Sequence, residues 1–196
     1  MRPSEIKQQI CAAQPGLDVL LSALPTVPLM RPKHTKVIEA VPQIVVSQML
    51  SRHAAATIIE RAQALATDHG EESIAWLTEQ QLRRCGISGR KAKSISLFAE
   101  QYHDDPEHYE GWKHLSHDEL RSAVGRHWGM SDWTASMLSI FHFGHADVFP
   151  QGDGTIRRVT EHLTSHGVRI RPEKSTPYRS YLALYLWLLA DSGSLG

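Results

Sequence analysis

The sequence predicts an all-α protein. Along its 196 residues, apolar residues recur with the 3.6-residue period of helices, and the alternation of half-buried strands is nearly absent. The length suits one domain, or two intimately packed lobes, and is enough for a real hydrophobic core. We expect helices near residues 4–13, 16–24, 42–51, 54–67, 70–76, 79–85, 89–103, 117–126, 132–142, 154–165 and 177–190.

Turn residues separate these elements. Three prolines between Leu24 and Pro42 indicate a connector rather than a domain linker. Gly129-Met130-Ser131 has the composition of a tight reversal between two helices, because Gly can take a positive φ. Asp153 follows Pro150-Gln151-Gly152 and precedes an apolar-periodic run, so it stands where a helix N-cap belongs. An N-cap Asp is usually structural.

Charge and cysteine content restrict the function. The 21 basic and 21 acidic residues balance, so any affinity for nucleic acid must come from local placement of charge. Acidic residues concentrate between 100 and 119. This asymmetry suits one nucleic-acid-facing side, or else ordinary solvated helix faces. The basic residues gather at Arg83, Arg84, Arg90, Lys91 and Lys93, and at Arg157, Arg158, Arg169, Arg171, Lys174 and Arg179.

Nothing in the sequence indicates secretion or membrane insertion. Cys11 and Cys85 are the only cysteines and suit inert thiols in a reducing cytoplasm. The N-terminus lacks the apolar core of a signal peptide. The longest apolar run, 181–190, is too short to cross a bilayer and predicts a buried helix. We therefore expect a cytoplasmic protein, associated with the nucleoid if it binds DNA.

The order of three motifs carries a family resemblance. Gly129-x-x-x-Trp-Thr-Ala, then Asp147-Val-Phe-Pro, then Gly152-Asp-x-x-Ile-Arg-Arg resembles the helix-hairpin-helix (HhH-GPD) DNA glycosylase superfamily, and within it the bacterial 3-methyladenine DNA glycosylase II branch. The resemblance covers nearly everything after about residue 40. Further pieces stand in family order at 45–61, 82–93 and 177–187.

The resemblance implies a single glycosylase domain over 1–196, built as two helical lobes with a DNA-binding cleft. Residues of roughly 45–135 would form the central lobe, and both termini the other. It also makes Asp153 the catalytic carboxylate, because a carboxylate held against C1′ stabilises an oxocarbenium-like transition state and can orient water. Asp147 and Glu161 are the alternatives. The family has a structural Asp at position 147, and Glu161 lies well inside the next helix.

Trp133 distinguishes two mechanisms. Members that also cleave the strand carry a Schiff-base Lys at this position, so the resemblance implies a monofunctional enzyme. Trp133 is also expected in the base pocket, although a core position is the alternative. Met137 and Gly154 are the other expected pocket residues. Some members of the family have aromatic or bulkier residues at these two positions, so the pocket would be roomier or less aromatic, and lesion choice stays open.

The DNA-binding residues follow from the same resemblance. Bare amides at the hairpin would bind a phosphate. Ser131 and Asp132 replace the usual second Gly and the following Pro, which predicts a looser clamp. Met49 falls on the position of the side chain that fills the space left by a flipped base; a core Met is an equal alternative. The expected DNA contacts are Gln48, Met49, Gly129, Met130, Ser131, Thr134 and Arg157.

Few residues of the sequence indicate a metal or a cofactor. Across the family the hairpin holds a monovalent cation on main-chain carbonyls, here those of Gly125, His127 and Met130. The four-cysteine iron–sulfur loop of some members is impossible with two cysteines, and no other cofactor is expected. The pairs His162/His166 and His142/His145 lack an evident third ligand, so zinc is not expected.

These observations predict a monomeric, monofunctional DNA N-glycosylase that flips and excises alkylated bases of the 3-methyladenine type in base excision repair. Its partner would be double-stranded DNA containing damaged bases. Two alternatives stay open: a glycosylase for uracil or mismatched bases, and a helix-hairpin-helix protein that binds lesions without excising them.

Overall fold

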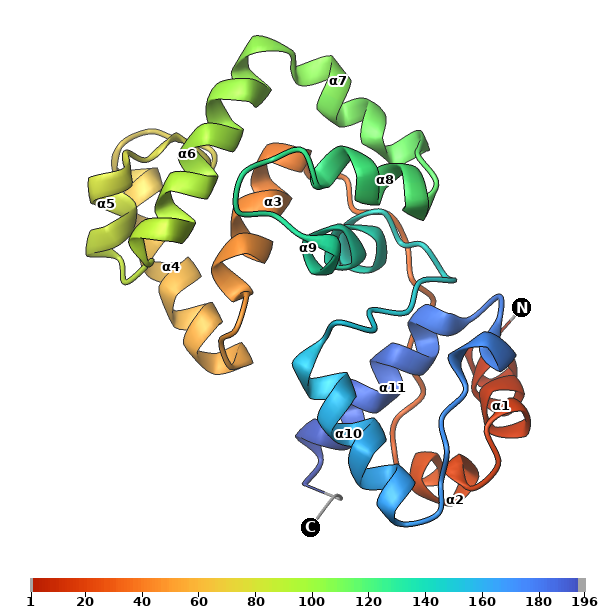
Figure 1. Cartoon of the computed structure of the whole chain (residues 1–196). Helices are drawn as coiled ribbons and strands as arrows, with labels where there is room; N and C mark the ends of the chain where they lie inside the picture. Colours follow the sequence, from red (N-terminus) through yellow and green to blue (C-terminus); the bar gives the residue numbers. More distant parts are fainter. Residues whose placement is uncertain (1, 194–196) are drawn as a thin grey trace. The chain divides into compact units, whose positions relative to one another are not determined.

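The computed structural model describes residues 2–193, and within that range it is helical without a strand, which confirms the predicted fold class. The chain divides into two compact units (Figure 1). The central unit comprises Lys33–Leu138, and the terminal unit comprises Met1–Pro32 with Ser139–Gly196. No helix in the described part is both long and apolar enough to cross a membrane.

The central unit is a set of short helices begun by side-chain caps. Ser51, Thr78, Ser88 and Ser116 each accept a hydrogen bond from the third residue of the helix they precede. The helices are α3 (Val37–Ser47), α4 (Arg52–Asp68), α5 (Glu79–Arg84), α6 (Gly89–Asp104), α7 (Pro106–Glu110), α8 (His117–Val124) and α9 (Asp132–Met137), with 3₁₀ turns at Ile74–Trp76 and Gly111–His114.

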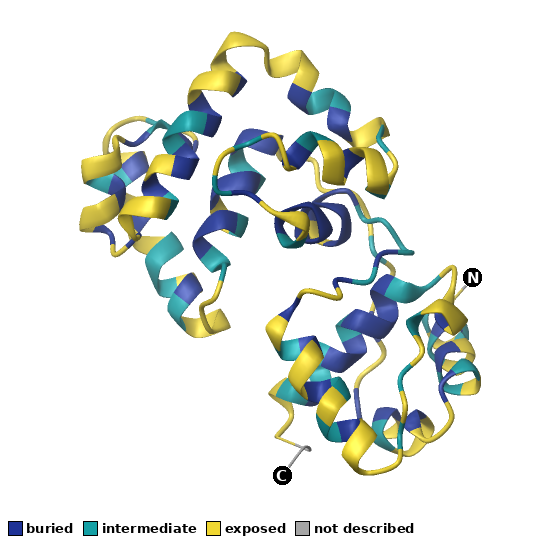
Figure 2. Ribbon diagram, in the orientation of Figure 1, coloured by how far each residue is buried: buried dark blue, intermediate teal, exposed yellow. Residues whose placement is uncertain are grey.

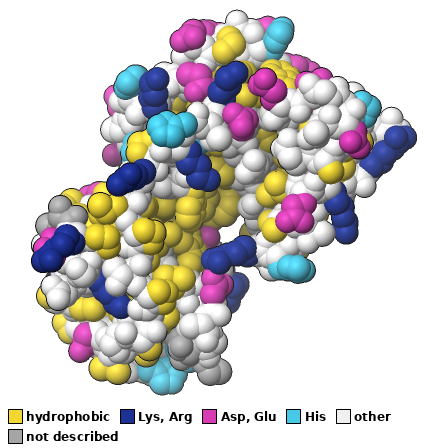
Figure 3. Space-filling model, turned by 180° about the vertical axis from the view of Figure 1, so that it is seen from behind, with side chains coloured by type: hydrophobic (Ala, Val, Ile, Leu, Met, Phe, Trp, Pro, Cys, Tyr) yellow, Lys and Arg dark blue, Asp and Glu magenta, His cyan; other side chains and the backbone are white. Residues whose placement is uncertain are grey.

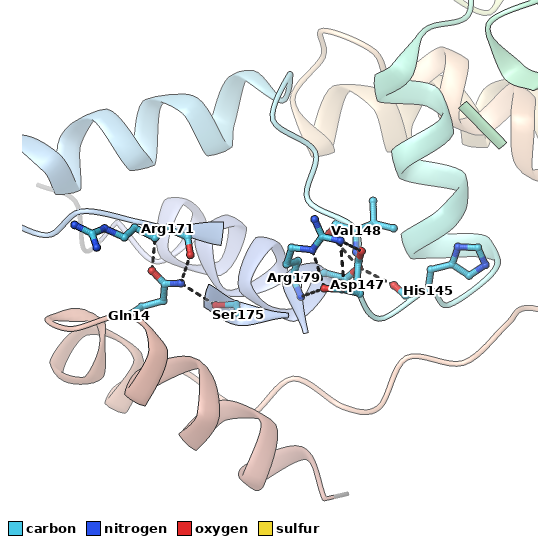
Figure 4. Close-up of polar contacts among 8 residues, drawn as sticks. Gln14, His145, Asp147, Val148, Arg171, Ser175 and Arg179 are labelled. Atoms are coloured by element: carbon cyan, nitrogen blue, oxygen red, sulfur yellow. Dashed lines mark hydrogen bonds and ion pairs between the residues drawn. The ribbon is translucent and has the colours of Figure 1, made fainter. Parts of the chain in front are cut away.

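The terminal unit joins the two ends of the chain. Its helices are α1 (Pro3–Ala13), α2 (Leu17–Ser22), α10 (Gly154–Ser165) and α11 (Arg179–Asp191), with a 3₁₀ turn at Pro172–Ser175. Buried residues line the sides of α10 and α11 that pack together (Figure 2). The buried Gln14 donates to the Arg171 carbonyl at 2.6 Å and to Ser175 Oγ at 2.9 Å, and accepts from the Arg171 amide at 2.9 Å (Figure 4). Residues before the connector therefore fold with the C-terminal part of the chain.

Helix α3 differs most from its expected position. It covers Val37–Ser47, not 42–51, and Pro42 lies inside it instead of beginning it. A proline there leaves the carbonyl of Ile38, four residues earlier, without its helical donor. The buried hydroxyl of Ser73 donates to that carbonyl at 2.9 Å. A distant side chain thus makes the proline tolerable.

Two other expectations are corrected. The helix expected at 70–76 is only the 3₁₀ turn at Ile74–Trp76, because Gly70 ends the preceding helix with a φ of +76°. The helix expected at 132–142 is α-helical only to Met137, and a π-helical segment, Leu138–His142, follows it directly. Helix α7 was not expected. It begins at Pro106, with Asp105 as its cap.

Candidate functional site

The hairpin lies between α8 and α9 in the central unit. Gly129 has a φ of +79°, as its place in the turn predicted, and the Met130 amide closes the reversal on the His127 carbonyl at 3.2 Å. A Cβ on Gly129 would lie 2.9 Å from Ser94 Oγ, and Ser94 Oγ donates to the Trp128 carbonyl at 2.8 Å. The close approach that requires glycine is therefore one to α6 within the protein, a contact the sequence did not reveal.

The unusual acidic residue of the hairpin has a partner. Asp132 Oδ2 accepts from Arg121 Nη2 at 2.8 Å, and the bond to Asp132 raises the pKa of Arg121. Both side chains are exposed. At the same turn, the Ser131 amide donates to Thr134 Oγ1 at 3.3 Å. The negative charge that replaces the usual proline is thus paired with an arginine.

The turn that ends α3, which we call the Met49 turn (Gln48–Leu50), presents its central side chain to solvent. Met49 has a φ of +57°, and its side chain is 100% exposed. The alternative that Met49 belongs to the core is therefore wrong. Gln48 Nε2 donates to Thr134 Oγ1 at 2.9 Å, so this turn and the start of α9 are directly joined.

One of the basic residues expected on the DNA-facing side lies inward. Lys91 Nζ donates to the carbonyls of Val46 at 2.8 Å and Gln48 at 2.6 Å. Its neighbours Arg90 and Lys93 are exposed and lie over the ring of Trp128, at 5.9 and 5.2 Å from its centroid. On the face drawn in Figure 3, basic side chains stand in several separate places among acidic and apolar ones.

Asp153 is confirmed as the N-cap of α10 in the terminal unit. Its Oδ1 accepts from the amides of Thr155 at 3.0 Å and Ile156 at 2.9 Å, and from Trp187 Nε1 at 3.0 Å. The residue is only 8% exposed. Three N–H donors on one oxygen fix the orientation of the carboxyl group.

Trp187 and Phe141 are candidate site residues that the sequence analysis missed. Trp187 lies on α11 and donates to Asp153, and its ring packs on Phe141 with centroids 5.5 Å apart. Phe141 is 42% exposed, so the pair presents an aromatic surface near the carboxylate. The available signal was a tryptophan on a buried helix, because a buried indole N–H needs an acceptor.

The two alternative carboxylates have other partners. Asp147 forms a bidentate pair with Arg179, at 2.8 and 3.1 Å, and also accepts from the Arg179 amide (Figure 4). It ties the start of α11 to the loop that precedes α10, the structural position that the resemblance implied. Glu161 lies on the exposed side of α10, 3.9 Å from Arg157.

The residues expected around the base lie in both units. Trp133 is half-buried, so both interpretations of it stay open, and Met137 is buried. Both belong to the central unit, whereas Asp153, Gly154 and Arg157 belong to the terminal unit. A Cβ on Gly154 would meet nothing within 4 Å, so glycine is not required there by packing.

The candidate metal positions are the hairpin carbonyls and the two histidine pairs. Because the His127 carbonyl already accepts from Met130, a cation at the hairpin would use its second lone pair. His162 and His166 stack with ring centroids 4.3 Å apart. Among residues 2–193, no three His, Cys, Asp or Glu side chains gather at one point.

A helix-hairpin-helix unit and a carboxylate fixed at a helix N-terminus define the class of helical DNA repair glycosylases. Residues 43–179 match the family described as HhH-GPD superfamily base excision DNA repair protein. The chain belongs to this superfamily.

Individual relatives agree with this assignment. The chain is 30% identical over 162 residues, 76% of each chain, to the alkylbase DNA glycosidase-like protein mag2 of Schizosaccharomyces pombe. Its fold is similar to that of the 3-methyladenine DNA glycosylase Mag1 of the same yeast in complex with abasic DNA, with a TM-score of 0.78, 24% identity and coverage of 93% and 95%. A DNA-3-methyladenine glycosidase from Bacillus halodurans gives a TM-score of 0.69, 22% identity and coverage of 96% and 90%.

Proposed function

We propose that this protein is a monofunctional DNA glycosylase that excises alkylated bases in base excision repair. The observation that carries the proposal is the Asp153 carboxylate, which is buried and held by three donors in a member of a base excision repair superfamily. The mag2 and Mag1 relatives, both named for alkylated-base chemistry, support the choice of lesion class.

The residues divide the reaction between them. The hairpin around Gly129 and Met130 binds a phosphate of double-stranded DNA, with Gln48, Ser131 and Arg157 in further contacts. Thr134 is fully buried and accepts from Gln48 and Ser131, so the prediction that it contacts DNA is wrong. The damaged base leaves the stack, and Met49 takes its place. In the central unit, Trp133 and Met137 are the residues proposed to contact the flipped base. In the terminal unit, Gly154 is the proposed contact, and the aromatic surface of Phe141 and Trp187 is suited to an electron-poor ring.

Asp153 acts on the sugar. The electron pair of the C1′–N bond leaves with the base and neutralises the positive charge that alkylation placed on the ring. The carboxylate stabilises the cationic sugar while water adds to C1′ and releases a proton. The products are the free base and an intact abasic strand.

The carboxylate also leaves a second candidate open. Asp153 caps α10, which is a complete structural role, and a protein that uses it only as a cap would bind lesions without excising them. The two candidates separate in one assay. Duplexes that each bear one defined lesion are incubated with the protein and then treated with hot alkali, which cleaves abasic sites.

We expect alkali-dependent cleavage at alkylated purines. Cleavage only at uracil or mismatches would transfer the protein to that class, and binding without cleavage at any lesion would favour the non-catalytic candidate. Borohydride should trap no protein–DNA adduct, because Trp133 stands where a Schiff-base lysine would be required.

Three further features belong to the proposal. The protein acts as a monomer in the cytoplasm and uses no iron–sulfur cluster. The main-chain carbonyls of Gly125, His127 and Met130 would hold a monovalent cation, which would supply positive charge at the bound phosphate.

A further inference from the structure

The Met49 turn begins where α3 ends, and the last carbonyls of a helix have no partner within it. Lys91 is the partner of two of these carbonyls: its ammonium donates to those of Val46 and Gln48, at 2.8 and 2.6 Å. The contact joins α6 to a turn more than forty residues earlier in the chain. One side chain thus fixes the backbone on the N-terminal side of Met49.

The position of Lys91 excludes a simple role as a surface cation. The side chain is half-buried, and burial lowers the pKa of its ammonium. Lys93, two residues later on α6, is exposed with its ammonium over Trp128. Only the second of these lysines is available to a phosphate, although the sequence places them in one basic cluster.

Met49 needs such a brace. A non-glycine residue in the left-handed region is strained by roughly 1–2 kcal/mol. Its side chain is fully exposed, so it makes no packing contact that would offset this strain. The turn is instead held from behind, by Lys91 through two carbonyls and by Thr134 through the Gln48 side chain.

We infer that Lys91 is a positioning residue that holds Met49 outward, ready to enter the DNA stack when the damaged base leaves it. This inference rests on the proposed function. One helical turn further along α6, Ser94 holds the hairpin carbonyl of Trp128. The same helix therefore fixes the Met49 turn and the hairpin relative to each other within the central unit.

The test compares duplex and single-stranded substrates. Filling the vacated space matters only where a stacked and paired base has to be displaced. Lys91→Met keeps the apolar stem and removes the donor. We expect single-turnover excision from duplex DNA to fall about tenfold, and excision of the same lesion in a single strand to fall less than about twofold. Met49→Ala should give the same pattern. The Lys91→Met/Met49→Ala double variant should be no slower than Met49→Ala alone, because residues that act through one another are not additive.

Equal losses on both substrates, or additive losses in the double variant, would overturn the inference. Lys113→Met removes an exposed ammonium from the same unit and should change neither rate. If Lys91→Met fails to give a cooperative melting transition, Lys91→Arg replaces it. We then expect a smaller change in the ratio of the duplex rate to the single-strand rate, because the guanidinium donors lie at a different distance from the backbone of α6.

A second readout does not depend on excision. Chymotrypsin cleavage after Leu50 should become faster in Lys91→Met and stay unchanged in Lys113→Met, since loss of the brace frees the turn. A parent protein that excises nothing would defeat the proposed function and leave this measurement intact. Unchanged cleavage after Leu50 would defeat the brace itself.

Discussion

The Met49 turn and the Asp153 loop are fixed in opposite ways. Met49 is held through its backbone neighbours, and its side chain is fully exposed. Asp153 is held through its side chain, which accepts three hydrogen bonds and is almost completely buried. In the proposed reaction the Met49 side chain has to enter DNA and must remain free to move, whereas the Asp153 carboxylate has to stabilise a transient cation and must already be in place. The two regions thus differ in the part of the residue that the protein holds, the backbone at Met49 and the side chain at Asp153.

The largest effect is expected at the fixed group. Asp153→Asn keeps an oxygen that can accept from the Thr155 and Ile156 amides, but it loses the negative charge. We expect excision to fall about a hundredfold or more, with little change in melting temperature or in affinity for abasic DNA. Single-turnover rates measure excision, and calorimetry measures the melting temperature and the affinity for abasic DNA. Excision at the parent rate would remove Asp153 from the mechanism.

The next effect separates folding from DNA contact at the hairpin. Gly129→Ala combines a positive φ with a Cβ placed 2.9 Å from Ser94 Oγ. We expect it to destabilise the protein by about 2 kcal/mol and to weaken DNA binding. Ser94→Gly alone should also destabilise the protein, because it removes the hydrogen bond to the Trp128 carbonyl. The double variant should lose less stability than the sum of the two single variants, because the clash is then absent. Denaturant unfolding gives the comparison, and an equally stable single variant would contradict the geometry.

A smaller effect is expected at the tryptophan behind the carboxylate. Trp187→Phe keeps a ring against Phe141 but removes the N–H that donates to Asp153. Loss of one hydrogen bond to a charged group predicts excision slowed by about tenfold. Trp76→Phe, a similar change in the central unit, is the control. A Trp187→Phe protein as active as the parent would mean that two amides suffice to orient the carboxylate.

The smallest effect is expected at the surface. Lys93→Ala removes one exposed cation beside the hairpin. If Lys93 contacts a phosphate, the slope of log affinity against log salt should become shallower by about 0.9. Lys113→Ala should leave the slope unchanged. Titration of each variant with DNA at several salt concentrations gives the slopes. Identical slopes for both variants would exclude Lys93 from the DNA interface.

Local patterns predicted much of this structure. The helical period located most helices, and preferences for glycine in turns and Asp at helix caps placed Gly129 and Asp153 correctly. These features depend on neighbours within a few residues, so the sequence displays them directly.

The rest depends on partners far apart in the chain. Pro42 suggests a helix start until Ser73 is seen to satisfy the carbonyl of Ile38. Lys91 looks like one more surface cation until α6 places it against the end of α3. No local pattern distinguishes it from Lys93, because the choice of partner is made by the packing of helices.

The hydrogen bond between Gln14 and the Arg171 segment has a practical consequence for anyone preparing a shortened protein. The stretch that matches the family, 43–179, looks like a natural unit for expression. Trimming to it would delete Gln14, most of α11 and the indole that holds Asp153. Such a fragment would retain the motifs between Gly129 and Arg158 but lack most of the terminal unit's core, so an inactive truncation would say nothing about the catalytic competence of the whole chain.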